Sequence, residues 1–339
     1  MYDETFISLH GRLFGITPDG LPVANGRIMF PAPGTGRGRL IFCDPANGSD
    51  GRKAYTPGTA VATLGDAHDL ATAGENDVVV LIGDGGTTAT ARVEETLVWS
   101  KNATHLMAIT APTWEAQRAR ISHLTTATLN INPLMQVTAS GCFFGGFSFF
   151  QGVGEAATDE ELLEVTGDRN YFYNIHFGGM GHANGAARAG SYLIQLTDGD
   201  ENTFERCAVG LETKQRGAAN ASVRVRSGSQ RNRFLDCEFP MAASETTPLW
   251  VDADADNALN GSTLIFRRCF FRNLLNISGA ATPAVVATYH AQVNGTIYFV
   301  DCVAAATKWA AAGTEVQVGG NSALPEGFNT GLTDQARDS

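Results

Sequence analysis

The sequence has few charged residues and no cluster of positive charge. Charged residues make up 17% of the 339 residues, and the formal net charge is −11. Arginine far outnumbers lysine, and the basic residues are spread along the chain. Proteins that bind nucleic acid or an anionic membrane surface through electrostatics carry a concentrated basic patch. Neither nucleic acid nor a membrane is therefore expected as a partner.

Long apolar runs are also absent. No segment approaches the roughly 18 consecutive apolar residues that a membrane-spanning helix needs, so no membrane span is predicted. The first fifteen residues, MYDETFISLHGRLFG, contain early acids and lack the apolar stretch of a secretion signal. We therefore expect no Sec signal peptide.

The motifs of common catalytic and metal sites are missing as well. The seven histidines form no H-E-x-x-H, the cysteines and histidines lack zinc-site spacing, and no G-x-S-x-G is present. The segment GDGG at 83–86 follows a VVVLI run, but neither a G-x-G-x-x-G pattern nor a helix follows it. A dinucleotide site is therefore not predicted, and no cofactor is expected.

What the sequence does contain is a repeat of about thirty residues. Each copy can be anchored on one phenylalanine, with steps of 28, 32, 30, 32 and 33 residues. The anchors are Phe144, Phe172, Phe204, Phe234, Phe266 and Phe299. Each follows a strand-like run and a polar turn, as in LLEVTGDRNYF and LIQLTDGDENTF. With 38 glycines and short β-type runs, this period predicts an all-β solenoid with one coil per repeat.

Equivalent positions of successive repeats should stack at the interstrand spacing. Three residues after each of the last four anchors lies a cysteine, and we expect a buried row of reduced thiols rather than disulfides. Two residues before three anchors lies an asparagine, which predicts a ladder of turn amides. The cysteines are Cys207, Cys237, Cys269 and Cys302, and the asparagines are Asn170, Asn202 and Asn232.

Two residues after the anchor, the side chain should face outward. The residues there alternate in charge as Arg206, Asp236, Arg268 and Asp301. Opposite charges on neighbouring strands attract, so the alternation favours parallel, in-register pairing of coils. The step of three residues between the anchor and the cysteine row predicts a bend or bulge after the phenylalanine.

Together, these ladders and the coil length resemble the right-handed parallel β-helix, pectate-lyase-like. The segment at 41–85 strengthens the resemblance, because it contains a strand, a D-x-x-N-G-S-D motif, P-G-T-x-x-A-T-L and a V-V-V-L strand. The resemblance implies a short helix at about 62–74 that caps the open end of the stack. It is informative about the fold and says little about activity.

The fold class predicted is thus all-β, a right-handed parallel β-helix of about eight or nine coils with a short N-terminal capping helix and extended terminal arms. We expect an N-terminal anchoring arm at 1–40, a first strand and capping helix at 41–75, the β-helix at 76–305, and a C-terminal tail at 306–339.

The fold commonly hosts polysaccharide lyases and hydrolases, so outward carboxylates are the first catalytic candidates. The weak candidates are Asp236 and Asp301, with Glu205 and Glu238 as further outward acids. Asp236 falls between Arg206 and Arg268, which favours a structural ladder over catalysis. Trp250 and Trp309 could stack on a sugar, although packing at coil edges is the simpler interpretation.

The alternating acids Asp252, Asp254 and Asp256 are the one weak candidate for a metal site. Carboxylate oxygens are the ligands that Ca²⁺ prefers. The segment lacks the glycine and terminal glutamate of an EF-hand loop, so a solvated turn is the favoured interpretation and no metal is predicted.

A β-helix with non-coil arms resembles structural proteins of tailed-bacteriophage virions. This resemblance implies a head decoration protein on the outer capsid surface, bound to the major capsid protein or other virion proteins through residues 1–40. Association into a homo-oligomer stays open. Two alternatives stay open. One is a tail spike or fibre polysaccharide depolymerase, a lyase or hydrolase, and the other is a non-catalytic module that binds a surface glycan.

Overall fold

The structure is a computed structural model. It describes residues 38–324 apart from 85, 111–112, 116–117, 125–130, 153–158, 255–256, 275–279, 290–293 and 312–314. Outside this range it describes the backbone of six short strands. Four of them form an antiparallel meander, namely β1 (Ile7–Leu9), β2 (Arg12–Ile16), β3 (Pro22–Ala24) and β4 (Arg27–Ile28). The other two, β32 (Leu324–Pro325) and β33 (Leu332–Thr333), pair near the C-terminus.

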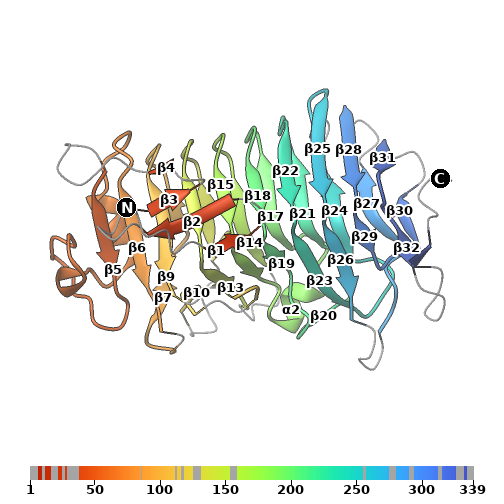
Figure 1. Cartoon of the computed structure of the whole chain (residues 1–339). Helices are drawn as coiled ribbons and strands as arrows, with labels where there is room; N and C mark the ends of the chain where they lie inside the picture. Colours follow the sequence, from red (N-terminus) through yellow and green to blue (C-terminus); the bar gives the residue numbers. More distant parts are fainter. Residues whose placement is uncertain are drawn as a thin grey trace.

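Three parallel sheets run side by side along the whole stack (Figure 1). The ten-stranded sheet contains β5 (Leu40–Cys43), β6 (Val78–Ile82), β9 (His105–Ile109), β12 (Phe143–Gly145), β15 (Tyr171–Tyr173), β18 (Thr203–Glu205), β22 (Asn232–Leu235), β25 (Ser262–Arg267), β28 (Gly295–Val300) and β31 (Val316–Gly319). From β6 onward, consecutive strands of this sheet are separated in sequence by strands of the other two sheets, so each coil contributes to all three.

The nine-stranded sheet contains β7 (Thr90–Val93), β10 (Arg120–His123), β13 (Ser148–Phe150), β16 (His176–Gly178), β19 (Ala208–Val209), β20 (Gln215–Arg216), β23 (Glu238–Ala243), β26 (Phe270–Asn273) and β29 (Val303–Ala304). The eight-stranded sheet contains β8 (Leu97–Trp99), β11 (Met135–Val137), β14 (Glu161–Val165), β17 (Tyr192–Thr197), β21 (Ala221–Arg226), β24 (Leu249–Ala253), β27 (Val285–Tyr289) and β30 (Lys308–Ala310). The fold is therefore an all-β solenoid, as predicted.

The stack amounts to about seven turns, slightly fewer than the eight or nine expected. The expected number of coils was the length of residues 41–305 divided by the repeat length. Residues 41–75, however, form β5, a 3₁₀ turn at Pro57–Thr59 and the capping helix, and they add no full coil. Without them, about 230 residues at about 31 per coil give the observed number.

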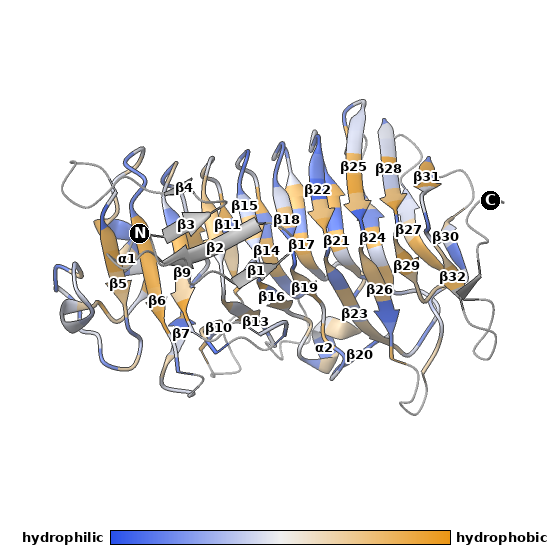
Figure 2. Cartoon of the chain, viewed as in Figure 1, coloured by the Kyte–Doolittle hydropathy of each residue, from blue (hydrophilic) through white to orange (hydrophobic). Residues whose placement is uncertain are grey.

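The anchor phenylalanines stack inside the solenoid. Strand register pairs Phe172 with Phe204, and Phe204 with Phe234, and the same register continues to Phe266 and Phe299. Successive rings are nearly parallel, with centroids 4.4 Å apart for the first pair and 4.6 Å for the second. The prediction of parallel, in-register coils is therefore confirmed, and the anchor phenylalanine of each of these coils lies in the core. Figure 2 shows the same strands with their hydrophobic positions.

The bend predicted after the phenylalanine is formed by one residue in the left-handed backbone conformation. The residues two positions after the anchor have positive φ, for example 55° at Arg206, 54° at Asp236 and 52° at Arg268. This conformation turns the chain from the ten-stranded sheet into the nine-stranded sheet within two residues. The cysteine that follows points inward, and all six cysteines are buried and free.

The cysteine row also makes hydrogen bonds between coils. The Sγ of Cys207 donates to the carbonyl oxygen of Phe172 at 3.6 Å, and the thiols of Cys237, Cys269 and Cys302 repeat the contact with the phenylalanine one coil back. The row therefore ties the bend of each coil to the anchor of the coil before it.

The asparagine ladder is buried, but the side chains bond to backbone rather than to one another. The Oδ1 of Asn202 accepts from the backbone N–H of Asn170 at 2.9 Å, and its Nδ2 donates to the carbonyl oxygen of Gly167 at 3.0 Å. Asn232 makes the same pair of contacts with Asn202 and Gly199. Each amide thus bridges two backbone groups of the neighbouring coil.

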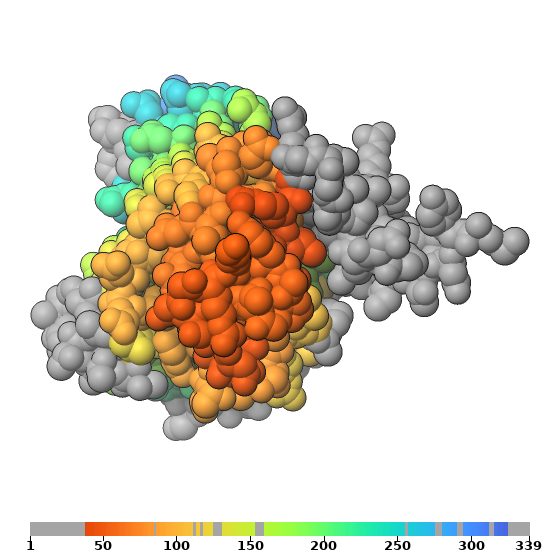
Figure 3. Space-filling model, turned by 90° about the vertical axis from the view of Figure 1, so that its left-hand side faces the viewer, coloured from red at the N-terminus to blue at the C-terminus, as the bar shows by residue number. Residues whose placement is uncertain are grey.

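Helix α1 (Leu64–Leu70) closes the N-terminal end of the stack, which faces the viewer in Figure 3. It is shorter than the predicted 62–74. The side chain of Thr63 accepts from the backbone N–H of Asp66 and begins the helix. The Nζ of Lys101 donates to the carbonyl oxygens of His68, Asp69 and Ala71, which satisfies the final turn and ends the helix there. None of the helices among the described residues has the length and apolar character to cross a membrane.

Candidate functional site

The outward acids singled out from the sequence are engaged by neighbouring side chains or backbone. Asp236 forms a two-pronged ion pair with Arg268, with N–O distances of 2.6 and 2.7 Å. The guanidinium of Arg206 does not join it and lies instead over the ring of Trp114, 5.7 Å from the centroid. Asp301 accepts from the backbone N–H of Asn321 at 2.9 Å. These contacts hold both catalytic candidates in a structural arrangement.

The two further acids are also held within the nine- and ten-stranded sheets. Glu205 is only 6% exposed and accepts from the hydroxyl of Tyr171. Glu238 lies 3.4 Å from the guanidinium of Arg272. Trp250 and Trp309 are 0% and 4% exposed, so both pack in the core and neither is presented to a sugar.

Asp252 and Asp254 lie at the end of a strand rather than in the solvated turn that was expected. Asp252 lies in β24 and accepts from the hydroxyl of Thr288 at 2.8 Å. Asp254 lies 3.3 Å from Arg226, and both carboxylates lie 3.6 Å from Nε of Arg224. Asp256 falls outside the described residues. No group of three or more metal-ligating side chains occurs among the residues that were described.

Asp252 belongs to a row of polar side chains across the eight-stranded sheet. The row occupies equivalent positions of successive coils, in register from β11 to β27. We call it the polar row, and its members are Gln136, Glu164, Gln195, Arg224, Asp252 and Thr288. Outward positions of a solvated sheet are normally exposed, yet Gln195 and Arg224 are only 6% and 7% exposed. A line of buried and partly buried polar side chains is the strongest candidate for a site on this sheet.

Three side chains donate hydrogen bonds to the carboxylate of Glu164, a member of the polar row. The amide of Gln136 donates to its Oε2 at 2.9 Å, and the amide of Gln195 donates to its Oε1 at 3.1 Å. The hydroxyl of Thr197 donates to the same oxygen at 3.3 Å.

A second carboxyl group, Glu161, lies three residues earlier on β14. Burial raises its pKa, the hydrogen bond from Tyr192 lowers it, and the charge of Glu164 raises it further. A carboxyl group with a raised pKa near a second carboxyl group is a candidate for general acid–base chemistry. Arg224 adds a buried cation, and its guanidinium lies 5.6 Å from the centroid of the Tyr192 ring.

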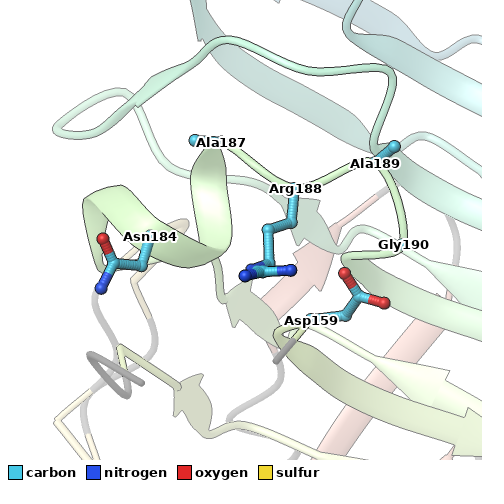
Figure 4. Close-up of a pocket in the computed structure, with 6 residues that line it drawn as sticks. All are labelled: Asp159, Asn184, Ala187, Arg188, Ala189 and Gly190. Atoms are coloured by element: carbon cyan, nitrogen blue, oxygen red, sulfur yellow. The ribbon is translucent and has the colours of Figure 1, made fainter. Parts of the chain in front are cut away.

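A pocket of about 510 Å³ adjoins the polar row. It is formed by the loop around α2 (Ala183–Ala186) and by Asp159, and Figure 4 shows the Asn184, Arg188 and Asp159 side chains around it. The backbone of this loop is fixed to the row, because Nη1 of Arg224 donates to the carbonyl oxygen of Gly190 at 2.7 Å. The polar row and the pocket therefore form one candidate site.

The spacing of carboxylates in this site limits its chemistry. Glu164 and Asp252 are separated by three strand intervals, which is about 14 Å at the usual interstrand distance. Glycoside hydrolysis needs two carboxyl groups about 5–10 Å apart. The two row carboxylates therefore do not form a hydrolase pair, and Glu161 with Glu164 is the pair that remains.

Most of this site was missed in the sequence, although its signal is visible there. The strand runs LMQVT, LLEVT, LIQLT and VRVRS each have a polar residue between apolar ones. The polar residue is the third of the run at Gln136, Glu164 and Gln195, and the second of the run at Arg224. Aligning the upstream strands as strictly as the phenylalanine strands would have placed them in one row.

No protein-family model matches the chain, and no curated protein matches its sequence. Solved structures do match. Pectate lyase Pel9A superposes with a TM-score of 0.57 at 14% identity, over 88% of this chain and 74% of that one. A pectin methylesterase from Aspergillus niger gives 0.56 at 14% identity, over 90% and 94%. Pectin methylesterase PemA from Erwinia chrysanthemi gives 0.56 at 11% identity, over 85% and 91%. The stacked ladders, the three parallel sheets and these likenesses together show that the chain has the right-handed parallel β-helix fold that pectate lyases and pectin methylesterases also have.

Proposed function

We propose that the chain is a structural protein of a tailed-bacteriophage virion, most specifically a head decoration protein on the outer capsid surface. The observation that carries the proposal is the engagement of its outward acids. Asp236 is bound to Arg268, and Asp252 and Asp254 are bound to Arg224. Charges that neutralise each other along one face of a sheet hold neighbouring coils together. They leave few unpaired acids to bind a substrate.

The interior supports the same role. The phenylalanine stack, the buried thiols and the asparagine ladder repeat in every central coil, so each coil is tied to the next by side chains as well as by backbone. Breaking one coil would expose the cores of both neighbours. A rod with this construction suits a particle surface that must resist unfolding.

The N-terminal strands support an attachment role. β1 to β4 pair in an antiparallel meander, and none of them joins the three parallel sheets. We infer that residues 1–40 bind the major capsid protein or another virion protein, and that the β-helix projects outward.

The test is a reconstitution on capsids assembled without the chain. The purified chain should bind them at a fixed number of copies, and a variant lacking residues 1–37 should not bind. The truncated variant begins before β5, so its thermal unfolding serves as the folding control. Full binding of the truncated chain, or no binding of the whole chain, would contradict the proposal.

A second candidate function is polysaccharide cleavage, and the Glu161–Glu164 pair favours it. This candidate predicts release of reducing ends, or of unsaturated ends, from capsular or pectic polysaccharide. It also predicts that Glu164→Gln abolishes the release, while Asp236→Asn leaves it unchanged because Asp236 is ion-paired with Arg268 and does not line the pocket. Our proposal predicts no release by either variant or by the unchanged protein.

A further inference from the structure

The outward face of the ten-stranded sheet changes character along the stack. Side chains alternate between the two faces of a strand, so the residues that flank each core position point away from the solenoid. From β5 to β15 these outward residues are almost all apolar or aromatic, and from β18 onward charged residues appear among them. Figure 2 shows the same change between β5 and β6, which are hydrophobic throughout, and β22, which begins with hydrophilic residues. We define the apolar face as the outward side of β5, β6, β9, β12 and β15.

The apolar face is buried. Val78 and Val80 are 1% and 6% exposed, and Phe42 and Phe143 are 8% and 5% exposed. Phe42, Val78 and Val80 form a hydrophobic cluster of their own, separate from the interior core, and apart from Ala60 its described members all come from β5, β6 and β9. Side chains stand roughly perpendicular to their sheet, so those on one outward face cannot bury one another to this extent. A further layer must therefore cover them.

Further along the same face, charged side chains are exposed. Strand register places Arg233 one coil beyond Thr203 and Arg267 one coil beyond Leu235, in the two columns that continue the apolar face. Both arginines are exposed. The covering layer therefore ends near β18. From β5 to β15 it extends over about 19 Å of the stack at the usual strand spacing.

The chain enters the solenoid at the edge of the apolar face. Residue 38 comes shortly before β5, the first strand of this sheet, and Arg39 holds this point in place. The backbone N–H and the guanidinium of Arg39 both donate to Asp77, at 2.7 Å each. Asp77 is 0% exposed and directly precedes β6. Residues 1–37 therefore join the solenoid beside the face that needs a cover.

Residues 1–37 also have a suitable size and composition for the covering layer. The meander β1–β4 contains three strand intervals, about 14 Å between its outer strands, against about 19 Å for the apolar face. Its sequence contains the apolar segments ISL at 7–9, RLFGI at 12–16 and RIMF at 27–30. Antiparallel sheets commonly pack one face on a core and leave the other face to solvent. A contiguous apolar surface normally marks an interaction site.

We propose that residues 1–37 dock in cis on the apolar face, as a second sheet layer packed across β5 to β15. One side of the meander then covers Phe42, Val80 and Met107, and its other side stays available to another protein. The docking fixes the direction in which the N-terminal segment is presented relative to the solenoid. The contact belongs to the free chain, and it holds whether or not the chain binds a capsid.

Thiol labelling tests the docking, because all six native cysteines are buried. Val80→Cys places a thiol in the middle of the apolar face, and Arg233→Cys places one at an exposed position of the same sheet face as the matched control. In the whole chain, a maleimide should label Val80→Cys at least tenfold more slowly than Arg233→Cys. Removal of residues 1–37 should bring the two rates together. The truncated chain with only its native cysteines should stay unlabelled, which shows that it is folded.

Two results of the labelling would overturn the proposal. One is equally fast labelling of Val80→Cys and Arg233→Cys in the whole chain. The other is protection of Val80→Cys that increases with protein concentration and accompanies a dimer in light scattering, because a second copy would then be the cover. The measurement uses no capsids, so its outcome is separate from that of the capsid-binding test.

A charge placed on the apolar face gives a test that needs no truncation. In Val80→Asp the carboxylate would have to be buried beneath the meander, which is costly, so the docking should weaken. Trypsin should then cleave at Arg12 or Arg27 at least tenfold faster than in the unchanged chain. Leu235→Asp is the matched control, because Leu235 lies in the same column beyond the apolar face. Equal cleavage in Val80→Asp and Leu235→Asp would refute the docking.

Discussion

The asparagine ladder gives the most direct test of how the coils are held together. In Asn202→Ala two buried backbone groups lose their partners, the N–H of Asn170 and the carbonyl oxygen of Gly167. Asn202 is 0% exposed, so water cannot replace the amide without opening the coil. Each unsatisfied buried group costs about 1–3 kcal/mol, and we expect the free energy of unfolding to fall by about 3 kcal/mol.

The assay is urea unfolding followed by tryptophan fluorescence and by far-ultraviolet circular dichroism, which should report the same transition. The matched control is Asn47→Ala, because Asn47 is exposed and bonds only to the nearby Asp44. The control should change the free energy of unfolding by less than about 0.5 kcal/mol. If Asn202→Ala were no more costly than the control, the ladder would not stabilise the stack and the reasoning would be wrong.

Three more predictions follow from particular contacts. Phe204→Ala removes a ring stacked at 4.4 and 4.6 Å between its neighbours and should cost about 3–5 kcal/mol in urea unfolding, whereas a loss under 1 kcal/mol would contradict the stack. Asp236→Asn breaks the ion pair with Arg268, whose side chain is 46% exposed, and should cost less than about 1 kcal/mol. Burial lowers the pKa of His105 to about 4 from 6.5, and its Nδ1 accepts from the N–H of Phe143, so the folded protein binds this proton less readily. Stability should therefore be full above pH 6.5 and decline by up to about 3 kcal/mol as the pH falls to 4, and His105→Asn should flatten that decline.

The ladders could be predicted from sequence because each depends on one residue type at one position of the repeat. The repeat positions that Phe204 and Cys207 occupy face inward in every coil, so the burial of the residues there follows from the periodicity. The outward positions are different. The sequence places Arg206 next to Asp236, but its guanidinium lies over Trp114, a residue more than ninety positions earlier. Contacts with loops from distant coils are not encoded in the period, so this partner could not be predicted.

The candidate site was missed for a related reason. Burial of Arg224 depends on carbonyl groups of Ala189 and Gly190, which belong to a loop that occurs in one coil only. The alternation of LLEVT and LIQLT indicates an outward polar residue, yet an outward residue is expected to be solvated. Only the folded loop covers Arg224 and leaves it buried.

The same comparison explains why the outward acids are poor candidates for binding a ligand. Inward positions are fixed by stacking, and the outward acids near Asp236 and Asp252 are balanced by arginines. Binding of a charged ligand at such a position would first require an existing ion pair to be broken. A sheet face whose acids are paired in this way therefore contributes more to the stability of the solenoid than to the recognition of a charged partner.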